Sequence, residues 1–189
     1  MSGRSYMSEI RSTSPHIIQI VGYKNSGKST LIAALTRYLT SAGRRVAVIK
    51  HDGHDHFEMD HEGTDSYSFA QAGADAVVVL SEKRTALIER QATPLENMIK
   101  YLSAYDWILI EGYKLAPYPK LIMVREEKDL SLIETLQDVI GIVSWLDLEH
   151  DKRECMEDSE GPVWHSVHEA EDIARWLVSR ECHEEKRRL

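Results

Sequence analysis

The residues with the clearest chemical role lie in the segment GYKNSGKST, residues 22–30. Gly22, Gly27, Lys28 and Ser29 match the pattern G-x-x-x-x-G-K-[ST] of a phosphate-binding loop. In such a loop the backbone N–H groups point inward around the β-phosphate. The lysine reaches the β- and γ-phosphates, and the serine hydroxyl ligates Mg²⁺. The spacing therefore predicts a site for the phosphates of a nucleotide.

The flanks of this segment favour a phosphate site over a chance match. The apolar run HIIQIVG (16–22) precedes the loop and is typical of a buried strand. A helix is expected after it, because Leu31, Leu35 and Leu39 recur at helical spacing. The N-terminus of that helix adds a partial positive charge to an anion site.

Lys24 has two interpretations. Some dimeric proteins of this class carry a second lysine in the loop, which reaches the nucleotide of the partner subunit. That lysine usually stands at the second loop position, whereas Lys24 stands at the third. A solvated lysine with a weak attraction to phosphate explains Lys24 equally well. It is kept as a candidate contact to the nucleotide.

The expected strand WILIEG (107–112) supplies an acidic partner for the loop. A P-loop site needs a carboxylate near the bound Mg²⁺ and the attacking water. Glu111 ends an apolar run, where a charged residue rarely serves packing alone. Its side chain is longer than the more common Asp and can act through a metal-bound water. We predict that Glu111 is a catalytic residue and that Glu111 and Ser29 form the metal site.

The histidine-rich segment KHDGHDHFEMDH (50–61) has three interpretations. Its imidazoles, including those of His54 and His56, and its carboxylates suit a Zn²⁺ or Ni²⁺ site. Alternatively, it is a switch-like loop at the carboxyl end of the second strand, the edge at which open α/β sheets bind ligands. Asp52 would then touch Mg²⁺ or an attacking water as a second catalytic residue. A solvated polar loop is the third interpretation.

The rest of the chain alternates strand-like and helix-like segments, which predicts an α/β fold with a mostly parallel sheet. Two strands around a turn at Glu82 and Lys83 predict a β-hairpin. A capping box of Ser166 and Glu169 predicts a helix at the end of the chain. The other expected strands lie at 45–50, 119–125 and 139–145, the last being the final strand, and a short helix is expected at 65–73.

Composition narrows the function classes. The chain has 189 residues, a net charge of −8 and no long basic run, which disfavours nucleic acid and anionic membranes as partners. No apolar run approaches the roughly 20 residues that span a bilayer. The polar start of the chain and the presence of only two cysteines favour the cytoplasm. We expect a flexible tail (1–14), a P-loop domain (15–146) and an acidic extension (147–189) with one helix packed on that domain.

With these segments placed, the chain resembles the molybdopterin-guanine dinucleotide biosynthesis protein B family over about residues 15–146. The resemblance rests on an ordered set of stretches: GYKNSGKSTL, IKHDGHDHFEMD, GTDSYSFAQAGA, LIEGYK, PKLIMVR and VIGIVS. It implies a three-layer P-loop NTPase-type fold. It also implies a homodimeric adapter that binds GTP with Mg²⁺ and hydrolyses it weakly. Such an adapter assists the guanylyltransferase that joins GMP to molybdopterin, with molybdopterin itself as a further candidate ligand.

The resemblance also assigns residues. Glu111 corresponds to the acid of the family's EG pair, Lys114 to the lysine that follows, and Asp65 to the acid of its DS pair. The phosphate contacts would come from the loop residues Asn25, Ser26, Gly27, Lys28, Ser29 and Thr30.

The sequence departs from the family pattern in two places. Residues 62–65 read EGTD where the family commonly has PGKD, so the role of that lysine has no counterpart here. The guanine motif N-K-x-D does not occur in the chain, so the preference for guanine rests on the resemblance. Asp147 is either an acceptor for the guanine N1 and N2 protons or a solvated loop aspartate.

Three other functions fit the same loop. A metal-insertion GTPase would deliver Ni²⁺ or Zn²⁺ through the histidine-rich segment. A small-molecule kinase would turn over ATP rapidly in the presence of an acceptor. A binding module would hold the nucleotide as a structural element only.

Overall fold

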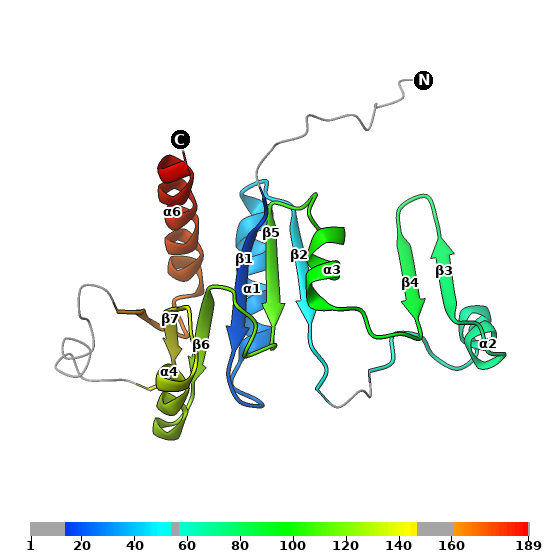
Figure 1. The fold of residues 1–189 in the computed structure, drawn as a ribbon, viewed down its shortest axis with the longest axis horizontal. Coiled ribbons are helices and arrows are strands. Elements are labelled where there is room, and N and C mark those ends of the chain that lie inside the picture. The colour runs from blue at the N-terminus through cyan, green and yellow to red at the C-terminus, as the bar shows by residue number, and fades with distance from the viewer. Residues whose placement is uncertain (1–13, 54–56, 147–160, 189) are drawn as a thin grey trace. The chain divides into compact units, whose positions relative to one another are not determined.

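The computed structural model describes residues 14–53, 57–146 and 161–188, which fall into two compact units (Figure 1). The first unit comprises residues up to His51 and from Leu102 onward, and the second comprises Asp52–Tyr101. Most of the predicted tail, His54, His56 and most of the acidic stretch that follows Leu146 lie outside the described residues. No helix within the described ranges is both long and apolar enough to cross a membrane.

The first unit is built on a six-stranded sheet with the order β2-β5-β1-β6-β7-β8. Every neighbouring pair in this sheet is parallel, which confirms the predicted parallel α/β fold. The strands are β1 (His16–Val21), β2 (Val46–Lys50), β5 (Trp107–Glu111), β6 (Lys120–Val124), β7 (Val139–Ser144) and β8 (Val163–Ser166).

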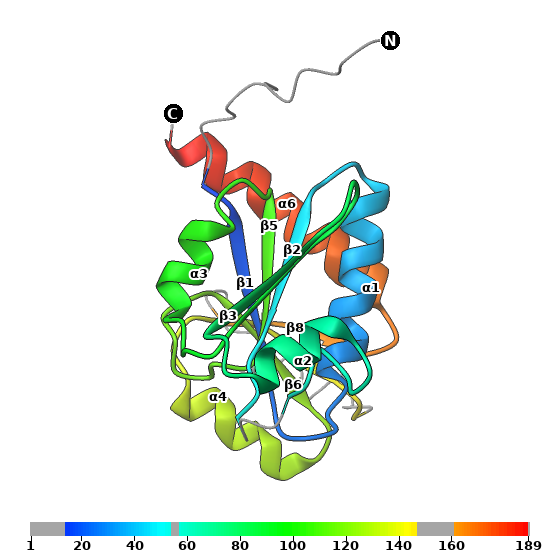
Figure 2. The ribbon, with the colours of Figure 1, turned by 90° about the vertical axis from the view of Figure 1, so that its right-hand side faces the viewer.

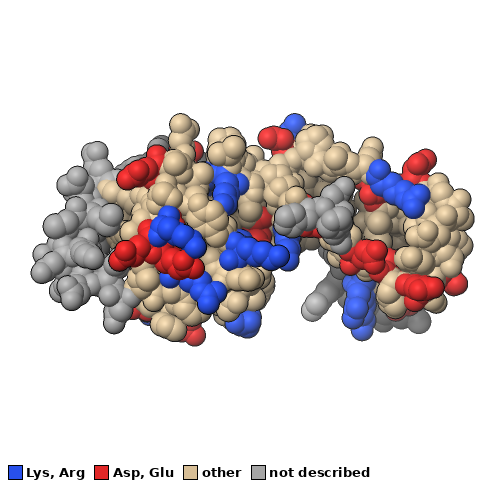
Figure 3. Space-filling view, turned by 90° about the horizontal axis from the view of Figure 1, so that it is seen from below, with Lys and Arg blue, Asp and Glu red and all other residues tan. Residues whose placement is uncertain are grey.

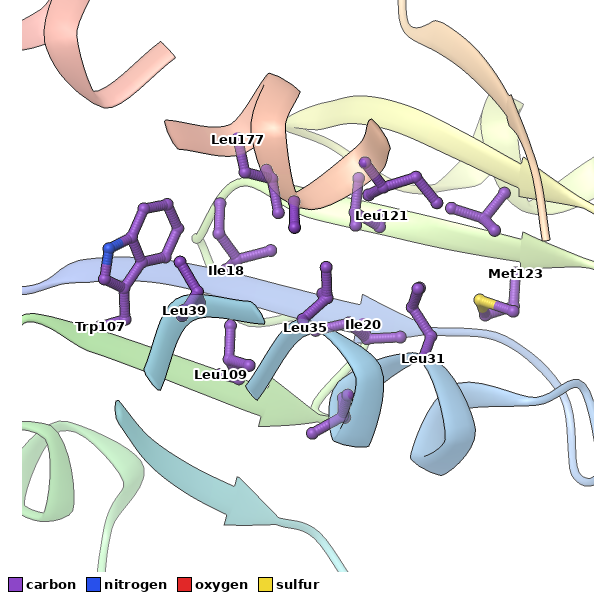
Figure 4. Packing of buried hydrophobic residues seen from close by; sticks show 14 residues of the cluster. Ile18, Ile20, Leu31, Leu35, Leu39, Trp107, Leu109, Leu121, Met123 and Leu177 are labelled. Atoms are coloured by element: carbon purple, nitrogen blue, oxygen red, sulfur yellow. The ribbon is translucent and has the colours of Figure 1, made fainter. Parts of the chain in front are cut away.

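Helices cover both faces of the sheet, so the first unit has three layers. Helices α1 (Lys28–Ser41) and α6 (Ala170–Arg188) lie side by side on one face (Figure 2). Leu35 of α1 and Leu177 of α6 pack there against alternate strand residues such as Leu109 (Figure 4). The other face packs against the 3₁₀ helix η1 (Glu127–Leu130) and α4 (Ser131–Thr135) through a second apolar cluster. Because both faces are covered, β5 and β6 are apolar almost throughout, as parallel strands usually are.

The end of the chain differs from the sequence prediction in one respect. Residues 139–145 were expected to form the last strand, but β8 follows and pairs in parallel with β7. Its sequence, VWHS, is short and partly polar, and so lacks the apolar run by which the other strands are recognised. The predicted C-terminal helix is confirmed, but it begins at Ala170 and not directly after Ser166, which ends β8. The Ser166 N–H donates to Glu169 Oε2 at 3.1 Å in the turn that leads into the helix.

The second unit contains α2 (Asp65–Gln71), the antiparallel hairpin β3 (Ala76–Leu80) and β4 (Thr85–Glu89), and α3 (Leu95–Tyr101). Thr64 caps α2 by accepting a hydrogen bond from the Tyr67 N–H. The predicted hairpin and its turn are confirmed. Ser81 closes the turn, because its N–H donates to Arg84 O at 2.9 Å and its hydroxyl accepts from the Arg84 N–H at 3.0 Å.

Candidate nucleotide-binding site

The phosphate loop joins β1 to α1, and its shape depends on glycine. A Cβ atom on Gly22 would lie 2.7 Å from Ser26 Oγ and 2.9 Å from Met123 Cβ, closer than side-chain carbons approach. Gly27, at the N-cap of α1, has a φ of +96°, in the left-handed region that glycine enters without steric cost. The two glycines of the motif are therefore required by the local packing and backbone, independently of any ligand.

Two residues that the sequence analysis did not identify donate hydrogen bonds to backbone carbonyl groups of the loop. The Arg125 guanidinium, directly after β6, donates to Asn25 O at 2.7 Å. Trp145 Nε1, directly after β7, donates to Ser26 O at 2.8 Å. Because C=O and N–H point in opposite directions across a planar peptide, the second contact turns the Gly27 N–H away from the indole. Arg125 and Trp145 thus fix the orientation of two peptide groups in the loop.

The predicted acidic partner lies beside the loop. The Ser29 hydroxyl donates to Glu111, at 3.0 Å from Oε1 and 2.9 Å from Oε2. Strand pairing explains the contact, because Glu111 lies opposite Ile20 of β1 and opposite Lys50 of β2. The carboxyl ends of three adjacent strands therefore meet at this acid. The structure brings Ser29 and Glu111 together, and their roles in metal binding and catalysis stay predictions.

This pair has the chemistry of a Mg²⁺ site. Mg²⁺ prefers oxygen ligands, usually one or two protein groups together with water and phosphate oxygens. A hydroxyl and a carboxylate in mutual contact at the start of α1 provide two such oxygens next to the phosphate loop. The residues present therefore fit the metal that the sequence predicts.

Two lysine side chains contact Tyr23 of the loop. Lys28 Nζ donates to Tyr23 O at 2.7 Å, across the loop, and Lys114 Nζ lies 4.3 Å from the centre of the Tyr23 ring. Burial lowers the pKa of Lys28, Glu111 opposes that shift, and the charges of Lys114 and Lys50 lower this pKa further. Figure 3 views this end of the strands, where Lys and Arg side chains gather among acidic ones. A bound polyphosphate would relieve the repulsion among these ammonium groups.

A buried glutamine and a stacked histidine position the segment after β5. Gln19 is fully buried in β1, and its Nε2 donates to Gly112 O at 3.1 Å and to Tyr113 O at 2.8 Å. The imidazole of His51 stacks on the Tyr113 ring, with the ring centres 4.2 Å apart. The backbone N–H of His51 donates to Glu111 O at 3.0 Å. Gln19 is the polar residue in the run IIQIV (17–21), whose other residues are all apolar, and this is the sequence signal that marks it.

Three other predicted residues lie on different elements. Lys24 is exposed on the loop, Asp52 is the first residue of the second unit, and Asp65 begins α2. Their roles stay predictions. Asp147 lies outside the described residues.

The described part of the histidine-rich segment does not form a metal centre. Across the described ranges, no group of three or more His, Cys, Asp or Glu side chains is arranged to hold a metal ion. His54 and His56, the histidines central to the metal-insertion interpretation, lie outside those ranges. Nothing in the described residues therefore favours that interpretation.

The parallel sheet, the loop between β1 and α1 and the acid at the end of the neighbouring strand β5 define a P-loop nucleotide-binding protein. The family model described as "Molybdopterin guanine dinucleotide synthesis protein B" (MobB) matches residues 17–145. The chain belongs to this family.

Individual relatives agree with this assignment. The chain is 32% identical over 154 residues to a probable molybdopterin-guanine dinucleotide biosynthesis adapter protein of Bacillus subtilis, covering 79% of this chain and 85% of that one. It is 33% identical to the adapter protein of Haemophilus influenzae, covering 72% and 78%. The crystal structure of Bacillus subtilis MobB superposes with a TM-score of 0.70 at 30% identity, covering 87% of this chain and 96% of that one.

Proposed function

We propose that this protein is a GTP-binding adapter in the synthesis of molybdopterin-guanine dinucleotide. It assists the guanylyltransferase that joins GMP to molybdopterin, and it hydrolyses GTP weakly. Membership of the MobB family supports the pathway. The contact between Ser29 of the phosphate loop and Glu111 is the structural observation that carries the nucleotide site.

Different residues of the site bind the phosphates, bind the metal ion and orient the attacking water. The loop backbone and the N-terminus of α1 hold the phosphates, and Lys28 neutralises charge on the β- and γ-oxygens. Ser29 and Glu111 would hold Mg²⁺, which when bound neutralises charge between the β- and γ-phosphates. Glu111 orients the attacking water, and Asp52 is the second candidate for that role.

Substitution of Lys28 tests the nucleotide site. Lys28→Ala removes the ammonium group that lies across the loop, and a hydrogen bond to a charged group contributes about 1.5–3 kcal/mol. We expect the affinity for GTP, measured by calorimetry, to fall roughly 10- to 100-fold. Lys83→Ala, in the exposed hairpin turn, is the control and should bind GTP normally. Unchanged GTP affinity in Lys28→Ala would show that the loop is not the site.

Association with the guanylyltransferase tests the adapter role. The full-length chain is mixed with the purified enzyme, with and without GTP, and the two are separated by size-exclusion chromatography. We expect a complex in at least one of the two conditions, and a higher yield of dinucleotide cofactor when the adapter is present. Failure to associate in both conditions, with no gain in yield, would contradict the proposal.

The second unit favours a homodimer. Its hairpin exposes four apolar side chains by half or more: Val78, Val79, Leu80 and Leu87. A two-stranded sheet is marginal by itself. Val78, Leu80 and Leu87 lie on one face of the hairpin, because side chains alternate along a strand, and that face is suited to cover a second copy. Leu80→Lys should convert the dimer to a monomer in light scattering. Leu115→Lys, at a site that is 89% exposed in the first unit, should not. A wild-type monomer at high concentration would refute the homodimer.

A further inference from the structure

Trp145 combines tight attachment to the phosphate loop with a large exposed surface. Its Nε1 donates to Ser26 O at 2.8 Å, and its Cζ2 lies 3.2 Å from the position that a Cβ on Gly27 would occupy. The residue is nevertheless 47% exposed. An aromatic side chain of this size usually loses most of its exposure when it is fixed by packing. Here one edge of the indole is held by the loop while nearly half of the residue stays exposed.

The sheet order places Trp145 on one side of the loop and Glu111 on the other. The sequence of strands is β5-β1-β6-β7, with Glu111 ending β5 and Trp145 following β7. The chain leaves β1 toward β2 and leaves β6 toward β7, so the connections diverge between the neighbours β1 and β6. Open α/β sheets bind their ligands outside the carboxyl ends of the strands at such a point.

A nucleotide on the loop would have a defined direction. Its phosphates and the metal ion would lie beside Lys28, Ser29 and Glu111, which supply ammonium, hydroxyl and carboxylate groups. The remaining part of the molecule, the nucleoside, then extends along the β6–β7 side. Trp145, which follows β7, is an exposed aromatic residue on that side, and it contacts the loop.

The chemistry of the indole suits a nucleobase. Aromatic side chains stack on bases with little regard to sequence, because every base has a π-face. The hydrogen bond to Ser26 O fixes the indole before any ligand binds. The imidazole of His168, which follows β8, meets the ring edge-on at 5.9 Å with an interplanar angle of 80°, and so supports it from another element.

We propose that the base of the bound nucleotide stacks on the indole of Trp145. The inference rests on the proposed nucleotide-binding function and adds the part of the site that receives the base. Stacking also supplies affinity for the base in a chain that lacks an N-K-x-D motif.

The test compares a ligand with a base and a ligand without one. GTP and inorganic tripolyphosphate are titrated, each with Mg²⁺, into the wild-type chain, Trp145→Leu and Trp145→Phe. We expect Trp145→Leu to lower the affinity for GTP about 5- to 100-fold more than it lowers the affinity for tripolyphosphate. This range corresponds to the free energy of base–aromatic stacking. Trp145→Phe keeps a π-face and loses the Nε1 hydrogen bond, so the ratio of the two affinities should stay within about threefold of wild type.

Two outcomes separate the possible failures. If Trp145→Leu lowers both affinities equally, Trp145 only braces the loop, and the inference fails while the proposed nucleotide site stands. If the wild-type chain binds neither ligand, the proposed nucleotide site and the inference both fail.

Fluorescence keeps the inference testable if Trp145→Leu does not fold. The wild-type chain and Trp145→Phe are titrated with GTP and with tripolyphosphate while tryptophan emission is recorded. We expect GTP, and not tripolyphosphate, to quench the emission, and we expect Trp145→Phe to lose this quenching while still binding GTP. Equal quenching by both ligands, or quenching that persists in Trp145→Phe, would overturn the inference.

Discussion

The Ser29 hydroxyl lies 2.9 Å from the Glu111 carboxylate, although the two residues are 82 positions apart in the sequence. One belongs to the first turn of α1 and the other ends β5, and they meet because β5 pairs with β1. Both partners offer oxygen atoms next to the phosphate loop. The contact thus joins the phosphate-binding motif to its acid in one site.

Glu111→Gln should remove the Mg²⁺ dependence of nucleotide binding. The amide keeps the size of the side chain and loses the charge that a divalent cation needs. We expect chelation of Mg²⁺ to lower the GTP affinity of the wild-type chain, because the metal neutralises phosphate charge, and to change the variant far less. Glu134→Gln, at an exposed site on α4, should behave as wild type. An equal effect of chelation on the wild-type chain and both variants would show that Glu111 does not bind the metal ion.

Nucleotide binding should weaken at alkaline pH because of Lys28. Burial holds the pKa of Lys28 below its ordinary value of 10.5, so its ammonium group loses its proton at a lower pH than a free lysine. A bound triphosphate favours the charged form, so binding takes up a proton, and affinity falls as pH rises through the lowered pKa.

Tripolyphosphate affinity measured by calorimetry from pH 7 to 10.5 checks this dependence on Lys28. Lys28→Arg stays charged throughout that range and should show a smaller decline than the wild-type chain. Parallel declines in the two chains would assign the effect to other groups.

Gly22→Ala should damage both stability and binding. The added methyl group would overlap Ser26 Oγ and the Met123 side chain and backbone, at 2.7–3.0 Å. Overpacking of this kind costs about 1–3 kcal/mol and shifts the loop from its resting shape. Gly53→Ala is the matched control, because its added methyl meets no atom within 4 Å. Thermal melting and GTP titration of both variants check the prediction, and a wild-type melting temperature for Gly22→Ala would contradict it.

Lys120→Met should destabilise the first unit. Lys120 is 1% exposed, and its Nζ donates to the carbonyl groups of Ala116, Tyr118 and Gln137 at 2.7–3.1 Å. Methionine fills a similar volume but leaves these carbonyls without that donor. We expect a loss of at least about 1–3 kcal/mol of unfolding free energy. Chemical denaturation measures this loss against Lys83→Met, whose lysine is exposed, and equal midpoints for the two variants would refute it.

His165 should make the fold sensitive to acid. Burial lowers its pKa, and the charges of Glu169 and Asp172 only partly oppose the shift. The unfolded chain therefore takes up a proton near pH 6.5 that the folded chain does not, so His165 reduces stability as pH falls from 6.5 through the lowered pKa. His165→Leu should show a smaller loss of unfolding free energy between pH 7 and 5 than the wild-type chain. Identical losses would show that His165 contributes nothing.

Local sequence patterns predicted the position of the loop between β1 and α1 and that of Glu111 at the end of β5, while the roles of these residues stay predictions. The loop depends on spacing within nine residues, 22–30, and Glu111 is marked by its place at the end of an apolar strand. Helix and strand alternation likewise predicted the parallel sheet. These features depend on residues that are close in the sequence, so they can be predicted from one sequence alone.

Arg125 and Trp145 were not predicted because their importance depends on strand order. Each simply follows a strand, and only the neighbouring positions of β1, β6 and β7 bring them to the loop. No local pattern encodes that order. β8 was missed for a different reason, since four residues with a half-polar composition give no clear periodicity. The burial of Lys120 likewise follows from three carbonyl partners, two of them in the preceding turn and one 17 positions away.

The position of β1 between β5 and β6 has a consequence for how the protein folds. His16 pairs with Trp107, so the strand that leads into the phosphate loop gains its first neighbour only after more than half of the chain has been synthesised. Pairings over such separations form slowly, because the entropy of closing a long loop must be overcome first. The hairpin β3–β4 pairs locally and is free of that delay. The most recognisable motif of the sequence therefore becomes structured late.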